Sequence, residues 1–421
     1  MLDKMYESFG ISKTTVELAK EIENRASALF KSYDDIVQFN QLKVLKAMQD
    51  NRVDTSCFNV ATGYGYNDYG RDTLEKIYAQ IFNTEDALVR AQIVSGTHAL
   101  YLTLSALTDV NDEILSPVGA PYDTLQSVIG IKKTANSLIE KGIKYAQVDL
   151  IGNDFDYDNI KKAINKNTRL VTIQRSKGYT LRESFSVKKI GQLISFIKNI
   201  DENIIIMVDN CYGEFVDYIE PTDVGADLAV GSLIKNPGGG LAASGGYIVG
   251  KKKYIEKIAD RLTAPGLGKE VGASLGQNAM LYQGLFQAPF VAVSALKGAV
   301  FTAGIFETAG YKCEPKFDCD DRSDIIQAVT LVDEKRLYTF CEGVQAAAPV
   351  DSYVKPVGDD MPGYEKKVIM AAGTFIQGSS IELSADAPVK EPYNVYFQGG
   401  LSYYHAKLGA MKAFEMVKSV K

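Results

Sequence analysis

The stretch Ala229-Val-Gly-Ser-Leu-Ile-Lys-Asn-Pro-Gly-Gly-Gly240 places one lysine, Lys235, between an apolar run and a glycine-rich turn. The apolar run predicts a buried strand, and the Asn-Pro-Gly sequence predicts the turn that ends it. A lysine there can have a partly desolvated amine and small neighbours, which a Schiff-base lysine needs to meet a flat aldehyde cofactor. Taken alone, the pattern also fits an exposed lysine that begins an ordinary turn.

Two further segments favour the cofactor hypothesis. Residues 204–209 are five apolar residues followed by Asp209, which predicts a buried strand that ends in a carboxylate. Ligands of open α/β sheets bind at this end of a strand, where an aspartate can pair with a protonated pyridine nitrogen or merely cap the next turn. The phosphate turn, Ser95-Gly96-Thr97, precedes a helical pattern, so its N–H groups could bind phosphate. Alternatively, it is only an N-cap.

In this order of phosphate turn, aspartate strand and lysine turn, the chain resembles the large domain of fold-type I pyridoxal-phosphate (PLP) enzymes. It is similar to the Cys/Met-metabolism group. More narrowly, it resembles the bacterial family of methionine gamma-lyase-like or "aluminium resistance" proteins, the cystathionine beta-lyase-like branch. The segments that carry the narrower likeness span most of the chain: Gly63–Tyr66, Val94–Ala99, Gly119–Leu125, Gln174–Tyr179, Val208–Phe215, the Lys235 turn and Gln377–Asp386.

The order of the expected elements predicts an α/β fold, in which strands alternating with helices form a mostly parallel, doubly wound sheet. Its expected strands are residues 92–94, 113–116, 145–148, 170–173, 204–209, 228–231 and 246–249. Helical spacing is expected at residues 14–31, 34–48 and 272–310, and a smaller α+β domain at 329–333 and 367–375. We therefore expect a helical N-terminal arm (1–55), a large PLP-binding domain (56–290) and a small C-terminal domain (291–421).

The resemblance implies a role for each matching residue. Lys235 would hold the cofactor as a Schiff base and then act as general base at the substrate Cα. Asp209 would keep the pyridine nitrogen protonated. Tyr122 would stack on the ring, unless it is a buried loop tyrosine and the stacking residue lies a few positions earlier. The residues expected at the phosphate are Ser95, Gly96, Thr97 and Ser232. The wider group has a threonine where this chain has Ile234, so one phosphate donor is missing or replaced.

The resemblance also implies a homodimer or homotetramer with shared active sites. In related enzymes a tyrosine and an arginine reach the phosphate of the neighbouring subunit, and Tyr64, Tyr66 and Arg71 lie in the corresponding region. Tyr64 or Tyr66 could also assist a leaving thiol. An arginine of the C-terminal domain usually binds the substrate carboxylate. This chain has Lys390 there, which lacks the bidentate fork, so either Arg175 takes the carboxylate or its binding is weaker.

The implied function is a PLP-dependent carbon–sulfur lyase. It would cleave a sulfur-containing amino acid of the cystathionine, methionine or cysteine type by β- or γ-elimination. The same fold and cofactor also serve aminotransferases and aldolases, so fold alone does not fix the reaction. A PLP-binding, stress-related protein with little turnover is the alternative from outside the enzymes.

Composition limits the other classes. The net charge is −6 and the basic residues are spread along the chain, so we expect no nucleic-acid partner. Two histidines and five irregularly spaced cysteines in 421 residues argue against a Ser-His-Asp triad, a metal site and a disulfide framework. The thiols are expected to be reduced, in the cytoplasm. We find neither an export signal nor a run of the ~18 apolar residues that a membrane helix requires, so no membrane partner is expected.

Overall fold

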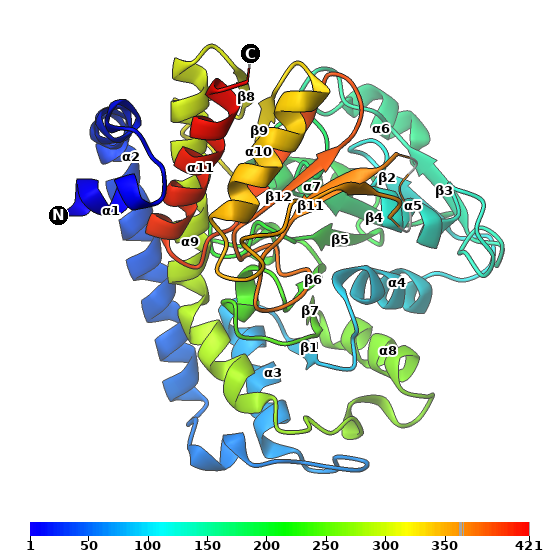
Figure 1. The fold of residues 1–421 in the computed structure, drawn as a ribbon. Helices are drawn as coiled ribbons and strands as arrows, with labels where there is room; N and C mark the ends of the chain where they lie inside the picture. Colours follow the sequence, from blue (N-terminus) through cyan, green and yellow to red (C-terminus); the bar gives the residue numbers. More distant parts are fainter. Residues whose placement is uncertain (362–363, 365, 421) are drawn as a thin grey trace.

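The large sheet carries the segments that the sequence analysis singled out (Figure 1). In the computed structural model, which describes residues 1–361, 364 and 366–420, this sheet has seven strands in the order β1-β7-β6-β5-β4-β2-β3. The strands are β1 (Asp86–Arg90), β2 (Glu113–Ser116), β3 (Lys144–Gln147), β4 (Thr168–Gln174), β5 (Ile205–Asp209), β6 (Leu228–Ser232) and β7 (Gly246–Gly250). Only β7 runs against the others, so the prediction of a mostly parallel sheet is confirmed.

Helices cover both faces of this sheet because its central strands are apolar on both sides. In β5, Ile205 and Met207 pack with helices α4, α5 and α8, whereas Ile206 and Val208 pack with α6 and α7. The helices of this part are α3 (Tyr69–Ile81), α4 (Gly96–Leu107), α5 (Asp123–Ile129), α6 (Tyr157–Ala163), α7 (Val187–Ile200) and α8 (Lys252–Leu262). Short 3-10 helices occur at Thr55–Phe58, Pro221–Val224, Asn236–Gly238 and Gly268–Glu270.

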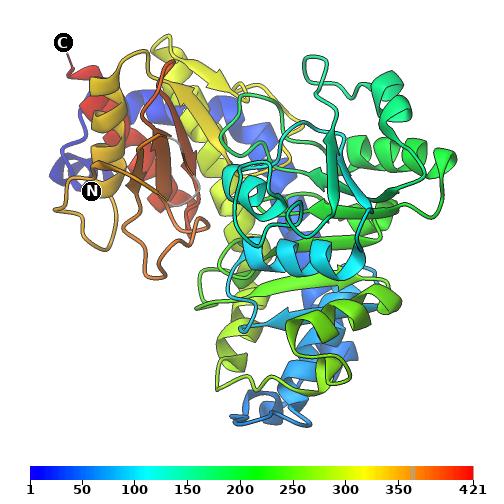
Figure 2. The ribbon, with the colours of Figure 1, turned by 90° about the vertical axis from the view of Figure 1, so that its right-hand side faces the viewer.

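A second sheet forms the smaller α+β part that the sequence predicts. It is antiparallel, in the order β10-β11-β12-β13-β9-β8. Helix α10 (Glu334–Ala346) packs on it, and α11 (Tyr403–Lys418) packs against α10. Its strands are β8 (Lys312–Glu314), β9 (Gln327–Thr330), β10 (Gly358–Asp359), β11 (Val368–Ala371), β12 (Ser384–Pro388) and β13 (Asn394–Gln398). Figure 2 shows this part beside the large sheet, with the long helices α2 (Lys13–Asp50) and α9 (Asn278–Thr308) behind both.

Helix α9 (Asn278–Thr308) connects the two parts, and the expected domain boundary at residue 290 falls inside it. By length and composition, it is the one described helix that could cross a membrane, so the expectation that no stretch qualifies is wrong here. Of its apolar window, 89% is buried inside the protein. The helix is apolar all round because it packs into the cores beneath both sheets and against α2.

Two sequence predictions differ from the structure. The N-terminal arm contains α1 (Leu2–Ser8) and one continuous helix α2 (Lys13–Asp50) in place of two helices, because residues 31–34 include no helix breaker and Tyr33 is buried. The first strand of the large sheet is β1, not residues 92–94. Its register with β7 pairs Asp86 with Gly250 and Arg90 with Gly246, and residues 91–93 form the turn that follows.

Candidate active site

Lys235 lies just beyond the end of β6, where Asn236–Gly238 turn the chain back toward β7. Its side chain is half-buried, and its Nζ is 3.8 Å from the centroid of the Tyr212 ring. Burial opposes the charged form, but the pKa of Lys235 is nevertheless raised well above its ordinary value by the groups around it: Cys211, Tyr212, Asp209 and Tyr122. The groups around the free amine therefore favour its protonated form.

Asp209 ends the neighbouring strand β5 and pairs in register with Val230 of β6. Its carboxylate is buried, and Oδ1 accepts a hydrogen bond from the Cys211 N–H at 3.2 Å. Burial raises the pKa of Asp209, while the charge of Lys235 acts in the opposite direction. A buried carboxylate needs a cation or further donors to stay ionised. A protonated pyridine nitrogen would meet that need.

The phosphate turn lies against the end of β6. Ser95 is the N-cap of α4, and its Oγ accepts from the His98 N–H at 3.1 Å. A Cβ on Gly96 would be only 3.2 Å from the Ser232 Cβ, so glycine permits this close approach. The Ser232 hydroxyl has no hydrogen-bond partner among the described residues. N–H groups at a helix start beside a free hydroxyl fit a phosphate.

Tyr122 joins the phosphate turn to the end of β4. Its hydroxyl is 2.9 Å from Thr97 Oγ1, and its N–H donates to Gln174 Oε1 at 2.9 Å. Gln174 is the register partner of Asp209. Burial, followed by the charge of Asp209, raises the pKa of Tyr122. The structure thus brings Tyr122, Thr97, Asp209 and Lys235 to the same end of the sheet.

The Arg175 side chain lies on the face of the sheet opposite to that of Gln174. Arg175 follows Gln174, and because successive side chains of a strand alternate, its side chain points away from that of Gln174. The side chain is fully buried, where Nη1 donates to Asn210 Oδ1 at 2.8 Å and lies 3.5 Å from Glu220 Oε2. This placement gives no support to a role of Arg175 in binding the substrate carboxylate.

Lys390 stands exposed in the connection between β12 and β13, beyond Pro388. No hydrogen bond or ion pair of its side chain to another described residue is present. A role in carboxylate binding stays a prediction for this residue.

Tyr64 and Tyr66 belong to the tyrosine loop, residues 63–68, which precedes α3. They are 73% and 57% exposed, their ring centroids are 5.6 Å apart, and neither contacts Lys235 within this chain. Arg71 is buried beneath the loop, where Nη1 donates to the carbonyl oxygens of Gly65 and Gly272 at 2.9 and 3.1 Å. In the single chain, Arg71 therefore fixes the loop and does not reach the phosphate turn.

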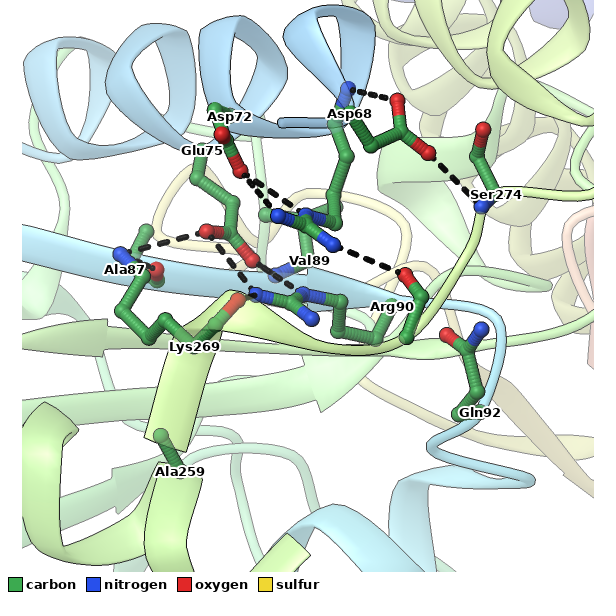
Figure 3. A network of polar contacts seen from close by, with 12 residues as sticks. Asp68, Asp72, Glu75, Ala87, Val89, Arg90, Gln92, Ala259, Lys269 and Ser274 are labelled. Carbon is green, nitrogen blue, oxygen red and sulfur yellow. Dashed lines mark hydrogen bonds and ion pairs between the residues drawn. The ribbon is translucent and has the colours of Figure 1, made fainter. Parts of the chain in front are cut away.

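The helix behind this loop is fixed by a buried ion pair (Figure 3). Glu75 of α3 accepts from Arg90 Nε of β1 at 2.5 Å, and Lys269 Nζ lies 3.2 Å from the other carboxylate oxygen. These attractions outweigh burial and lower the pKa of Glu75. The tyrosine loop is thus an exposed aromatic segment on a rigid base.

A buried carboxylate, Asp386 of β12, is held by Tyr179 and Gln398, three residues for which local sequence patterns predict no role. Tyr179 and Gln398 both donate to Asp386 Oδ2 at 2.8 Å, and Tyr179 packs in one cluster with Tyr212. Burial raises the pKa of Asp386, and the charge of Lys235 lowers it. Tyr179 and Asp386 are 207 positions apart. Both lie in segments that carry the family likeness, which is the only sequence signal that marked them.

The described residues include no group of three or more His, Cys, Asp or Glu side chains that could hold a metal ion. All five cysteines are unpaired, and Cys211 is the one beside Lys235 and Asp209. The titratable groups that meet at this edge of the sheet are thus Lys235, Asp209, Cys211, Tyr122 and Tyr212.

Comparison with known proteins agrees with this geometry. The sequence profile of the family described as "Methionine gamma-lyase" matches residues 15–418. The uncharacterised protein YnbB of Bacillus subtilis is 48% identical over 406 residues, which cover 96% of this chain and 96% of YnbB. A crystal structure from Clostridium novyi, named a carbon-sulfur lyase involved in aluminum resistance, is 48% identical with a TM-score of 0.94, covering 98% of this chain and 97% of that one.

A crystal structure from Listeria monocytogenes, for which a cystathionine beta-lyase involved in aluminum resistance is suggested, is 49% identical with a TM-score of 0.93. The match covers 95% of this chain and 99% of that one. These likenesses span both sheets, so they confirm the fold and the family expected from the sequence.

Proposed function

Because the chain belongs to the methionine gamma-lyase family, we propose that it is a PLP-dependent carbon–sulfur lyase of the cytoplasm that cleaves a sulfur-containing amino acid. One observation carries the proposal. A half-buried lysine, a buried carboxylate and a helix start beside a free hydroxyl meet at one end of parallel strands. This combination meets the three needs of the cofactor: a covalent anchor, a partner for the ring nitrogen and a phosphate site.

When bound, PLP supplies an electron sink for the pair left behind at the substrate Cα. Asp209 would keep a proton on the ring nitrogen, which its buried position favours because the carboxylate there needs a cation. The Gly96 N–H and the Ser232 hydroxyl would bind the phosphate. Lys235 Nζ would anchor the aldehyde carbon, and once the substrate amine has taken its place, Nζ would remove the Cα proton.

Loss of the Cα proton prepares the carbon–sulfur bond for cleavage, and the leaving thiolate then requires a proton. Tyr64 and Tyr66 are the proposed donors, supplied by a neighbouring subunit. The exposure of their neighbouring rings on the tyrosine loop supports this, because exposed apolar surface that is contiguous is typical of protein–protein contacts. We therefore propose a homodimer or homotetramer with shared active sites, and Arg71 as the base of the shared loop.

The central test uses purified protein loaded with PLP. We expect a visible absorbance band, and release of keto acid and thiol from cystathionine, methionine or cysteine, with the best substrate separating β- from γ-elimination. The Lys235→Ala variant should lose the band and the turnover. Reduction with borohydride followed by peptide mapping identifies the anchoring lysine, and a cofactor found on another lysine would refute the assignment.

The sharing of sites is tested by mixing inactive subunits. Lys235→Ala chains and Tyr64→Phe/Tyr66→Phe chains are expected to regain activity when combined, because one of the two sites in each hybrid dimer is then intact. Tyr404→Phe is the matched control, since Tyr404 is an exposed tyrosine of α11, outside the tyrosine loop. Absence of recovery after proven subunit exchange contradicts shared sites but leaves the lyase proposal standing.

A further inference from the structure

Tyr212 presents the face of its ring to the free amine of Lys235. The Nζ atom lies 3.8 Å from the ring centroid, well within the range at which an ammonium is attracted to an aromatic face. The titratable groups that act on Lys235 here are Cys211, Tyr212, Asp209 and Tyr122, and the buried carboxyl groups of Glu214 and Asp386 also interact with its charge. The Tyr212 ring therefore contacts the Lys235 amine directly on one side.

The backbone of Tyr212 is strained, which indicates that this position of the ring is enforced. Its φ is +72°, in the left-handed region that bulky residues avoid because Cβ approaches the backbone. Such a conformation persists only where the surrounding structure imposes it, and such residues gather at functional sites.

The surroundings that impose this turn are the buried groups on the far side of the sheet. Arg175 Nη1 donates to Asn210 Oδ1, and Glu220 accepts from the Asn210 side chain at 2.9 Å and from the Phe215 N–H at 2.9 Å. The Arg175 side chain passes so close to Gly213 that any Cβ there would overlap it. Asn210 and Gly213, which flank the segment that contains Tyr212, are thus held in place by Arg175 and Glu220.

Tyr212 also meets the small sheet. It packs against a cluster that contains Ile326, Ala328 and Tyr396, together with Tyr179. The partly buried Tyr212 side chain therefore contacts both Lys235, beyond the end of β6, and apolar side chains of the small sheet.

We propose that Tyr212 is a positioning residue: its ring holds Lys235 Nζ in place whenever the lysine is not bonded to the cofactor. The inference rests on the proposed function in one respect: it assumes that Lys235 is bonded to the cofactor in one state of the enzyme and free in another. In the free state Nζ first needs a fixed position from which to remove the Cα proton. It then becomes an ammonium, the form that the ring attracts most strongly.

The test is designed on the cofactor-free protein, so it does not depend on turnover. Lysine labelled with ¹³C at Cε gives one resonance per lysine, and Lys235→Arg identifies that of Lys235. In the wild type this resonance should be shifted by the ring current of Tyr212, and its titration midpoint should be high because the ring favours the ammonium. Tyr212→Phe keeps the ring and should match the wild type.

Tyr212→Asn is the decisive variant, because asparagine tolerates left-handed backbone but has no ring. We expect the Lys235 resonance to lose its ring-current shift and its titration midpoint to fall by about one pH unit, a tenfold change in proton affinity. In the PLP-loaded enzyme the same variant should lower kcat about tenfold with little change in KM. An unchanged resonance and midpoint in a folded Tyr212→Asn protein would overturn the inference.

The failure of the proposed function has a different signature. If PLP added to the wild type produces no band and no linkage to Lys235, the lyase proposal fails, while the titration still decides whether Tyr212 holds the amine. If the band forms and the titration is insensitive to the ring, only the role of Tyr212 is rejected.

Discussion

Gly213 lies directly against the guanidinium group of Arg175, so that a Cβ on residue 213 would be 2.5 Å from both Cδ and Nε. An arginine packed in this way is part of the protein interior. Its Nε and Nη2 atoms have no hydrogen-bond partner among the described residues, and its charge faces Glu220. Arg175 therefore supports the connection that carries Tyr212, and its role in binding a substrate carboxylate stays a prediction.

The first prediction follows from this relationship. Arg175→Met should destabilise the protein by about 3 kcal/mol, because it leaves the buried Glu220 without its cation. Urea unfolding measures the loss, and KM for the amino-acid substrate should change less than twofold. A rise in KM of tenfold or more at unchanged stability would instead restore Arg175 as the carboxylate-binding residue.

Arg175 also illustrates what the sequence can and cannot predict. Lys235, Asp209 and the phosphate turn each follow or precede an apolar run, so local pattern sufficed to expect them at one end of the sheet. The face of the sheet toward which the Arg175 side chain points depends on where β4 ends. A shift of one residue along the strand would move that side chain to the opposite face of the sheet. The apolar run at 92–94 predicts a strand that the structure does not contain. The strand is β1 instead, because its pairing with β7 extends from Asp86 to Arg90 and ends there.

Long-range contacts explain most of the remainder. The hydrogen bond from Tyr179 to Asp386 joins two parts of the chain whose approach is set by the packing of the small sheet. The left-handed backbone of Tyr212 likewise has no local signature, since its cause lies in Arg175, Asn210 and Glu220. Sequence patterns predicted which groups meet at this end of the sheet, but not the buried contacts that hold them there.

A second prediction concerns Asp209. Asp209→Asn should still bind PLP, because the anchor and the phosphate site are intact, but turnover should fall by ~10²-fold or more, since the charge that stabilises the protonated ring is lost. Titration of the absorbance band with PLP and release of keto acid measure the two effects separately. Turnover close to that of the wild type would reduce Asp209 to a cap of the turn after β5.

A third prediction addresses the base of the tyrosine loop (Figure 3). Glu75→Gln should cost about 3 to 5 kcal/mol of stability, because it leaves Arg90 buried without its carboxylate partner. Asp3→Asn is the control, since the pair between Asp3 and Lys20 is exposed and should contribute less than about 1 kcal/mol. Equal effects of the two substitutions, measured by chemical denaturation, would show that the Glu75 pair is no stronger than a surface pair.

The last prediction is a pH dependence that originates in Glu214. This side chain is fully buried, its Oε1 accepts from the Tyr247 hydroxyl at 2.8 Å, and its Oε2 has no partner among the described residues. Burial raises the pKa of Glu214 from 4.5 to about 8. Between these values the folded protein keeps a proton that the unfolded chain has lost. Folding then takes up a proton, and stability falls as the pH rises.

Glu214→Gln removes this titration while keeping an oxygen for the Tyr247 hydroxyl. The free energy of unfolding of the variant, relative to the wild type, should therefore increase from pH 5 to pH 8, by up to about 4 kcal/mol for a shift of this size. Urea unfolding at pH 5, 6.5 and 8 measures the difference. Two curves that run parallel over this range would mean that Glu214 is ionised in the folded protein, with its charge balanced by a neighbour.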